Sequence, residues 1–263
     1  MQIRKIGRVS LYQSEVFRNF PGIVHGFTTR DGGVSEGQYE SLSLSPYRGD
    51  DIACVHKNEE ILCESLGFDY CRLSSTKQEH TDNIEVIASE NIGIGVHSPW
   101  GKGVDAVITC EKNVPILCYS ADCVPIIMYA ADIEAIAAIH SGWKGTEMKI
   151  AEKTVKKLVE MGANPKNVYA AIGPCIGKCC YEVSGDVALK FDEKYYSGKP
   201  DGKYMLDLEA INLDLINRAG VKKENISVSG ICTRCHNDLF FSHRGQGGTS
   251  GTLGGIICIT ERE

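Results

Sequence analysis

Four short apolar segments follow one another so closely that no helix fits between them. They occupy residues 104–109, 115–119, 124–129 and 135–139, and they are rich in Val, Ile and Ala. Segments of this length and composition are typical of β-strands. A repeat of strand, helix and parallel strand needs roughly a dozen residues or more in each connection, so the sequence excludes that repeat here. Several runs are apolar at every position, which predicts sheets covered on both faces.

Three other segments have the periodicity of amphipathic helices. In residues 51–66, 146–161 and 207–219, apolar side chains recur every three or four positions, and a Gly follows each segment. An Asp stands at the start of the first and third, where it can cap the helix. Further strands are predicted at residues 168–172, 226–231 and 255–259. We therefore predict a mixed α and β fold, a single compact domain over residues 1–263 with helices as its outer layers.

The composition excludes several classes of protein. Hydrophobic residues make up 43% of the chain and charged residues 24%, which is ordinary for a globular protein. The formal net charge of −6 provides no electrostatic basis for a nucleic-acid partner. The sequence has neither a signal peptide nor a run long enough to cross a bilayer, so we expect a cytoplasmic protein without a membrane partner. No zipper or long apolar edge demands association, and a monomer is expected.

Three segments place a His or a Cys at the edge of a predicted strand, and they contain His80, Cys123 and His140. Side chains at strand ends can meet although they are distant in sequence. Two imidazoles and one thiolate form a zinc-ligand set that leaves the fourth tetrahedral position open, as in catalytic sites. Zinc there lowers the pKa of a bound water or polarises a substrate atom. The alternative is that each His is an ordinary hydrogen-bonded structural residue.

Twelve cysteines raise the question of disulfides or further metal sites. Without an export signal we interpret them as reduced thiols or metal ligands. Residues 232–236 (CTRCH) match the attachment pattern of c-type haem, which the same absence disfavours. A second, structural zinc site is an alternative, although the CxxC pair lacks a second CxxC pair at the usual spacing. Its candidate ligands are Cys175, Cys179, Cys180, Cys232 and Cys235.

Two glycine-rich segments lie beside arginines. Residues 31–33 (DGG) and 245–251 (GQGGTSG) match neither the Walker pattern nor the dinucleotide fingerprint, so they predict no nucleotide loop. As flexible loops they could close over a substrate. Arg30 and Arg244 beside them could hold phosphate through bidentate hydrogen bonds, with solvated surface arginines as the alternative.

Short motifs spread through most of the chain match one protein family. They are residues 25–30 (HGFTTR), 32–35 (GGVS), 77–80 (KQEH), 105–106 (DA), 121–125 (ADCVP), 140–146 (HSGWKGT), 173–176 (GPCI), 180–183 (CYEV) and 240–244 (FFSHR). On these motifs the chain resembles the YfiH or laccase-domain family, whose members are named polyphenol oxidases, peptidoglycan editing factors and purine nucleoside phosphorylases. The resemblance implies a layered α-β-β-α domain and one catalytic zinc held by His80, Cys123 and His140.

The resemblance also implies an enzyme whose partners are purine nucleosides and phosphate. Its expected reactions are phosphorolysis of adenosine, inosine, guanosine and methylthioadenosine, and deamination of adenosine. Deamination needs an activated water at the purine carbon that bears the amine. Phosphorolysis needs phosphate near the ribose C1′ and stabilisation of the departing base. On this hypothesis Arg30 and Arg244 contact phosphate or ribose, Gln78 binds substrate, and Asp122 orients a ligand or relays a proton.

Two segments depart from the family pattern. Residues 42–45 read Leu-Ser-Leu-Ser where the family usually has Leu-Asn-Leu-Gly, so Ser43 replaces an amide expected to line the substrate site. We expect substrate preference to shift. Residues 249–252 (TSGT) stand where the family commonly has Thr-Gly-Arg, so Thr252 leaves that loop without a cation. This change is expected to affect phosphate affinity more than metal binding.

Rival functions use different chemistry. A multicopper oxidase needs about ten histidines, many in His-x-His pairs. Seven histidines without such a pair exclude that mechanism, although Cu²⁺ could substitute for zinc. A metal-free hydrolase would use Cys123 as a thiolate nucleophile and a neighbouring His as base, on an amide such as a cell-wall peptide. A non-enzymatic editing factor or sensor would bind peptidoglycan precursors or nucleosides without turnover.

Overall fold

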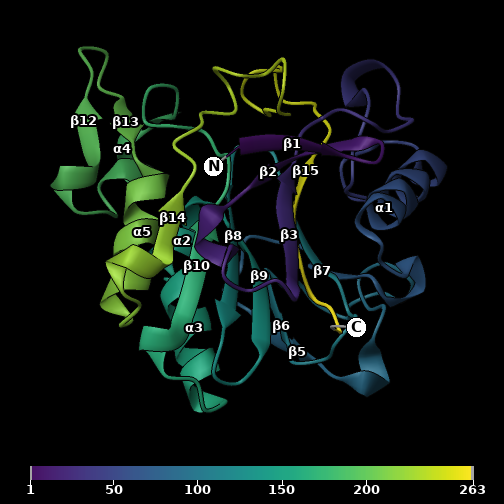
Figure 1. The fold of residues 1–263 in the computed structure, drawn as a ribbon. Helices are drawn as coiled ribbons and strands as arrows, with labels where there is room; N and C mark the ends of the chain where they lie inside the picture. Colours follow the sequence, from purple (N-terminus) through teal and green to yellow (C-terminus); the bar gives the residue numbers. More distant parts are fainter. Residues whose placement is uncertain (1, 262–263) are drawn as a thin grey trace.

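Two six-stranded sheets pack face to face and carry helices on their outer faces in the computed structural model, which describes residues 2–261 (Figure 1). The first sheet contains, in spatial order, β1 (Gln2–Ile6), β2 (Val9–Gln13), β3 (Ile23–Thr28), β15 (Leu253–Ile259), β7 (Ile116–Ser120) and β4 (Ser74–Ser75). The second contains β14 (Ile226–Val228), β10 (Val168–Ile172), β8 (Val124–Ala130), β9 (Ala135–Ser141), β6 (Ala106–Thr109) and β5 (Ile84–Ile87). A third, small sheet contains β11 (Glu182–Val183), β13 (Tyr204–Leu206) and β12 (Tyr196–Gly198).

The helices connect and cover these sheets. The α-helices are α1 (Ile52–Leu66), α2 (Trp143–Glu147), α3 (Ile150–Glu160), α4 (Gly185–Ala188) and α5 (Leu208–Arg218). Short 3₁₀ helices occupy Glu15–Phe17, Gly37–Tyr39, Tyr70–Arg72, Ser89–Asn91, Pro165–Asn167, Glu193–Tyr195 and Lys223–Asn225. None of the helices within residues 2–261 has both the length and the apolar character needed to cross a membrane.

The central strands are buried on both faces, as their continuous apolar sequences predict. Every residue of β8 and β9 is buried. In β8, Ile126 and Met128 belong to the apolar cluster shared with α3 and α5, whereas Ile127 and Tyr129 belong to the cluster between the two sheets. On the other side, Ile61 and Leu62 of α1 pack against β2, β7 and β15. The resulting α-β-β-α layering (Figure 1) confirms the predicted mixed α and β class.

Two of the three predicted helices are confirmed. In α1 the Asp51 side chain accepts a hydrogen bond from the Ala53 amide, and Gly67 ends the helix in the left-handed conformation with a φ of 73°. In α5 the Asp207 side chain caps the helix in the same way. The prediction of one continuous helix over residues 146–161 is wrong, because Lys149 has a φ of 63° and separates α2 from α3. A left-handed residue ends a right-handed helix, and apolar spacing does not reveal it.

The fold brings three chain segments to one end of the second sheet. Strands β8 and β9 are antiparallel and pair Val124 with Ser141 and Pro125 with His140. Strand β6 lies on the other side of β9 and pairs Ala106 with Ile139. The start of β8, the end of β9 and the start of β6 therefore lie side by side. The residues that flank these ends in the sequence are the ones that form the candidate site.

Candidate metal centre and its cavity

The structure brings His80, Cys123 and His140 together at this end of the second sheet. Their ligand atoms lie within 4.8 Å of one another. The Cys123 Sγ atom is 3.9 Å from His80 Nε2, and the two imidazole rings have centroids 5.0 Å apart at 85°. Cys123 directly precedes β8, His140 lies near the end of the paired strand β9, and His80 lies in the loop between β4 and β5. The arrangement is a three-donor set of the kind that binds a transition-metal ion.

The Asp105 carboxylate holds the loop that carries His80. This carboxylate is fully buried and accepts hydrogen bonds from the backbone amides of Glu79 at 3.2 Å, His80 at 3.1 Å and Thr81 at 2.8 Å. His80 itself has a φ of 60°, a conformation that costs a non-glycine residue free energy. The three amide hydrogen bonds to one carboxylate offset that cost. Asp105 therefore fixes the backbone position from which the His80 side chain extends.

The same carboxylate orients His140. Nδ1 of His140 donates a hydrogen bond to Asp105 Oδ1 at 2.8 Å, so Nε2 is the ring nitrogen that can bind a metal ion once it has lost its proton. A carboxylate behind a metal-binding imidazole is the common means of setting the tautomer and ring orientation. Burial alone would raise the pKa of Asp105, but the bonds from His140 and Thr81 hold it below its ordinary value. Asp105 lies in a recognised motif, yet its sequence position does not distinguish this role from that of a loop residue.

Cys123 and His140 form an electrostatically coupled pair. Burial alone would raise the pKa of the Cys123 thiol, but His140 and His80 outweigh it and lower that pKa to about 6. Burial alone would lower the pKa of His140, but Cys123 and Asp105 raise it to about 9. A thiolate is therefore favoured at neutral pH. Thiolate is the form of cysteine that binds a metal ion and the form that acts as a nucleophile.

Gly142 leaves the space in which the three donors meet. A Cβ atom at this position would lie 2.8 Å from His80 Cδ2 and 3.0 Å from Cys123 Sγ. Real Cβ atoms hardly ever approach another atom closer than 3.0 Å. The backbone has a φ of −73°, so glycine is required here for space and not for an unusual conformation.

A cavity of about 270 Å³ opens over the donor set. Its lining also includes Tyr47, Arg48, His243 and Thr252. Arg48 Nη2 donates a hydrogen bond to His243 Nδ1 at 2.8 Å. Burial lowers the pKa of His243, and the positive charge of Arg48 lowers it further, so His243 is suited to accept this bond. Thr252 lines the cavity, but its hydroxyl oxygen is itself buried and has no hydrogen-bond partner within the described part of the chain.

Comparison with known proteins identifies the family of this chain. The sequence model of the family described as "Multi-copper polyphenol oxidoreductase laccase" matches residues 24–260. The chain belongs to this family. Laccase-family relatives include "Purine nucleoside phosphorylase YlmD" of Bacillus subtilis, which is 34% identical over 93% of this chain and 91% of its own length. "Adenosine deaminase RL5", from an unknown prokaryotic organism, is 31% identical over 94% of this chain and 98% of its own length.

Two solved structures of similar proteins share the fold. YlmD from Geobacillus stearothermophilus superposes with a TM-score of 0.90 at 32% identity, covering 98% of each chain. The hypothetical protein YfiH of Bacillus licheniformis superposes with a TM-score of 0.91 at 30% identity, covering 98% of this chain and 99% of its own. The relationship expected from the sequence motifs is thereby confirmed.

The two arginines expected to hold phosphate do not line the cavity. The Arg30 guanidinium donates to the carbonyl oxygens of Glu40 at 2.8 Å and Asn237 at 2.9 Å, so it joins two loops of this laccase-family chain. The Arg244 guanidinium donates to the Glu182 carbonyl at 2.8 Å and borders a separate hollow. The cation that does line the cavity, Arg48, was missed because it lies in a polar segment without a recognisable motif.

Asp122 precedes Cys123, and its carboxylate bonds to the C-terminal loop. It accepts hydrogen bonds from the hydroxyls of Thr233 and Ser242 and from the Arg244 amide, each at 2.7 Å. These bonds tie the turn before β8 to residues 233–244. The observed geometry thus gives Asp122 a positioning function for the segment that carries His243.

Gln78 and Ser43 take different places. Gln78 lines the cavity, and its amide group both donates to the Tyr119 carbonyl and accepts from the Tyr119 amide at 3.2 Å. This exchange fastens the loop of His80 to β7. Ser43 is fully buried and does not line the cavity, whereas Ser45 of the same segment does.

Proposed function

We propose that this chain is a zinc-dependent purine nucleoside enzyme. Its reactions are phosphorolysis of adenosine, inosine, guanosine and methylthioadenosine, and deamination of adenosine. The observation that carries the proposal is the convergence of His80, Cys123 and His140 at a cavity whose lining includes the cation Arg48. Relatives named for phosphorolysis and for adenosine deamination support this substrate class.

The side chains present fit a zinc ion. Two imidazoles and a thiolate are its preferred donors, Asp105 orients one of the imidazoles, and Gly142 leaves room where the donors meet. Zn²⁺ bound by His80, Cys123 and His140 would supply a water of lowered pKa or polarise a substrate atom. Cu²⁺ has a higher intrinsic affinity for such donors, so it would substitute where it is available. In the described residues at most two histidines share a candidate metal group, which argues against a multicopper cluster.

Arg48 is the residue we assign to phosphate. Its guanidinium faces the cavity, and the bond to His243 fixes its orientation while leaving other N–H groups to donate. Arg30 and Arg244 are less suited, because backbone carbonyls already accept from their guanidinium groups. Arg48 thereby supplies the positive charge that the loop of residues 249–252 lacks.

A metal-free amide hydrolase is the second candidate, and one observation favours it. The Cys123 sulfur lies within 4.8 Å of a ring nitrogen of His140, and this imidazole lowers the pKa of the thiol, as in the cysteine–histidine pair that thiol hydrolases use. In that mechanism the thiolate attacks an amide carbonyl and His140 donates a proton to the leaving amine. The two candidates differ in their dependence on metal.

Turnover of adenosine and inosine by zinc-loaded protein, with and without phosphate, tests the proposal. We expect base and ribose 1-phosphate only when phosphate is present, and inosine from adenosine without it. Cys123→Ala should lose the zinc held by His80, Cys123 and His140, and turnover with it. Arg48→Met should raise the KM for phosphate at least tenfold and leave deamination largely intact, whereas Arg4→Met, on the exposed strand β1, should change neither.

Two results would overturn the proposal. Undiminished amide hydrolysis in the presence of chelator, abolished by alkylation of Cys123, would favour the metal-free hydrolase. Binding of adenosine without any product, by protein that contains its full complement of zinc, would favour the editing factor or sensor.

A further inference from the structure

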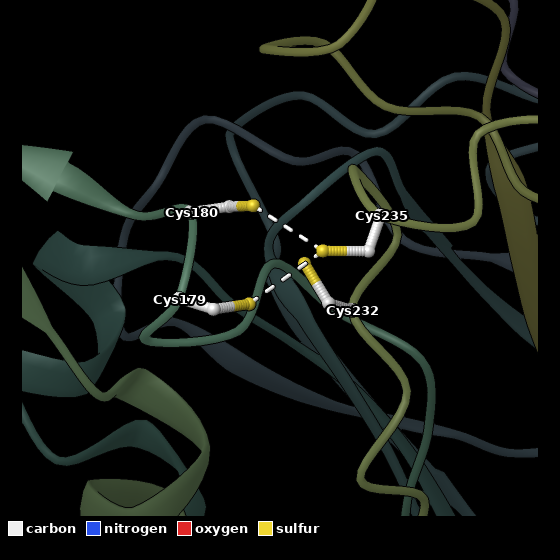
Figure 2. A group of neighbouring side chains, drawn as sticks. All are labelled: Cys179, Cys180, Cys232 and Cys235. Carbon is white, nitrogen blue, oxygen red and sulfur yellow. Dashed lines mark hydrogen bonds between the residues drawn. The ribbon is translucent and has the colours of Figure 1, made fainter.

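Four cysteine sulfurs lie together outside the cavity. Figure 2 shows Cys179 and Cys180 from one segment pointing toward Cys232 and Cys235 from another. All four Sγ atoms lie within 4.8 Å of one another, and all four thiols are free. Cys235 Sγ is 3.4 Å from Cys180 Sγ and 3.7 Å from Cys179 Sγ. None of these side chains lines the cavity over the first donor set.

We propose that these four cysteines bind one structural Zn²⁺. Zinc–sulfur bonds of about 2.3 Å in a tetrahedron place neighbouring sulfurs about 3.8 Å apart. The observed separations of 3.4 and 3.7 Å are close to that spacing. They are far from a disulfide bond, which joins sulfurs at about 2.05 Å. Four thiolates also fill the tetrahedral shell, which is typical of structural and not catalytic zinc.

Backbone pairing brings the two segments that carry these cysteines together. Cys175 and Cys232 form a parallel β-bridge, in which the Thr233 amide donates to the Cys175 carbonyl at 2.9 Å. This bridge aligns the two ligand segments. Gly177 permits their close approach, because a Cβ there would lie 3.2 Å from Cys232 Cβ and 3.3 Å from Cys179 Sγ. The side chains thus converge because the loops that carry them are paired.

The cluster differs from the one that spacing alone suggests. A vicinal pair, Cys179 and Cys180, takes the place of a second CxxC pair. Cys175 is outside the group, and its sulfur lies 4.0 Å from a Glu209 carboxylate oxygen. Binding converts four thiols and Zn²⁺ into a tetrathiolate complex with two negative charges and releases four protons, without oxidation or reduction. Arg234, between Cys232 and Cys235, is a cation next to that charge.

The site joins two segments that support the first donor set. Residues 233–244 follow the CxxC pair and carry Thr233 and Ser242, which bind the Asp122 carboxylate. The same stretch delivers His243 to the cavity. Zinc at the four cysteines therefore stabilises one wall of the cavity from outside, because metal-binding free energy adds to the stability of the segments it joins.

Metal analysis of a Cys123→Ala chain tests this inference without relying on the proposed function, because that variant lacks the only sulfur donor of the first set. After purification under reducing conditions, we expect one zinc per chain, surrounded by four sulfurs at about 2.3 Å in X-ray absorption. In the Cys123→Ala chain, a further Cys179→Ser or Cys235→Ser substitution should release this zinc. Adding Cys71→Ser, an exposed cysteine outside both groups, should leave one zinc in place.

A cobalt titration covers the case in which the double variants fail to fold. In the Cys123→Ala chain, Co²⁺ should produce the intense charge-transfer absorption of several thiolate ligands, and a single equivalent of Zn²⁺ should abolish it. The inference is overturned if the folded Cys123→Ala chain binds no metal, if its ion has nitrogen or oxygen ligands, or if a Cys180–Cys235 disulfide forms under reducing conditions.

Discussion

Gly142→Ala adds one methyl group at the point where the donors meet. The new Cβ would lie 2.8 Å from His80 Cδ2, about 0.6 Å inside ordinary contact distance, and 3.0 Å from Cys123 Sγ. The imidazole would have to move by several tenths of an ångström, whereas metal–ligand distances tolerate about 0.2 Å. We expect zinc affinity to fall about 10- to 100-fold, as when groups that orient ligands are removed. That loss corresponds to about 1.4–2.7 kcal/mol.

The fold should survive this substitution. Gly142 has a φ of −73° and a ψ of 177°, which alanine adopts without strain, so the unfolding free energy of the metal-free protein should change by less than about 1 kcal/mol. Competition with a chromophoric chelator measures zinc affinity, and adenosine turnover is followed in parallel. Gly101→Ala is the matched control, because nothing lies within 4 Å of a Cβ there. Folded Gly142→Ala protein with wild-type zinc affinity would refute the steric argument.

Three further perturbations test the surroundings of the site. Asp105→Asn should lower the free energy of unfolding in urea by about 2–4 kcal/mol, because an amide replaces the carboxylate that orients His140 and the loop of His80; unchanged stability would contradict this role. In metal-free protein the alkylation rate of Cys123 should rise as pH increases through about 6. In His140→Gln protein this rise should occur at a higher pH, closer to the pKa of an ordinary thiol. An unchanged dependence of the rate on pH would contradict the interaction between Cys123 and His140. Burial lowers the pKa of His25 from 6.5 to about 4. His25 therefore binds a proton more readily in the unfolded chain than in the folded one. Its contribution to the free energy of unfolding is fully present above pH 6.5 and falls by about 3 kcal/mol as the pH decreases to 4. A His25→Gln variant with the same acid-induced loss in urea unfolding would exclude His25 as its source.

Local signals were sufficient to predict α1, α5 and the central strands of the second sheet. The hydrogen bond from the Ala53 amide to Asp51 and the left-handed Gly67 at the other end of α1 involve residues close in sequence. Residue types therefore predict these ends. Strands β8 and β9 are buried on both faces and show it as continuous apolarity. Strand β1 was not predicted, because most of its side chains are exposed and it has no apolar pattern. It is a strand because it pairs with β2.

The donor set could be predicted only in part. The residue types of His80, Cys123 and His140 and their places at predicted strand edges indicated metal chemistry, and motif resemblance selected them together. The role of Asp105 was not predictable, because one carboxylate serves both His140 and a loop 24–26 residues before it in the chain. Such a shared acceptor exists only once the strands are paired.

By itself, the sequence determined the layers, the helix caps and the kinds of ligand that the chain can offer. Tertiary structure alone decided which side chains meet. Arg48 and His243 are 195 residues apart in sequence, and Cys179 and Cys235 are 56 apart. Their contacts depend on strand register and on the paths of loops, and the hydrophobic periodicity of the sequence predicts neither of these. A shift of one residue between β8 and β9 would separate Cys123 from His140 while leaving every local signal unchanged.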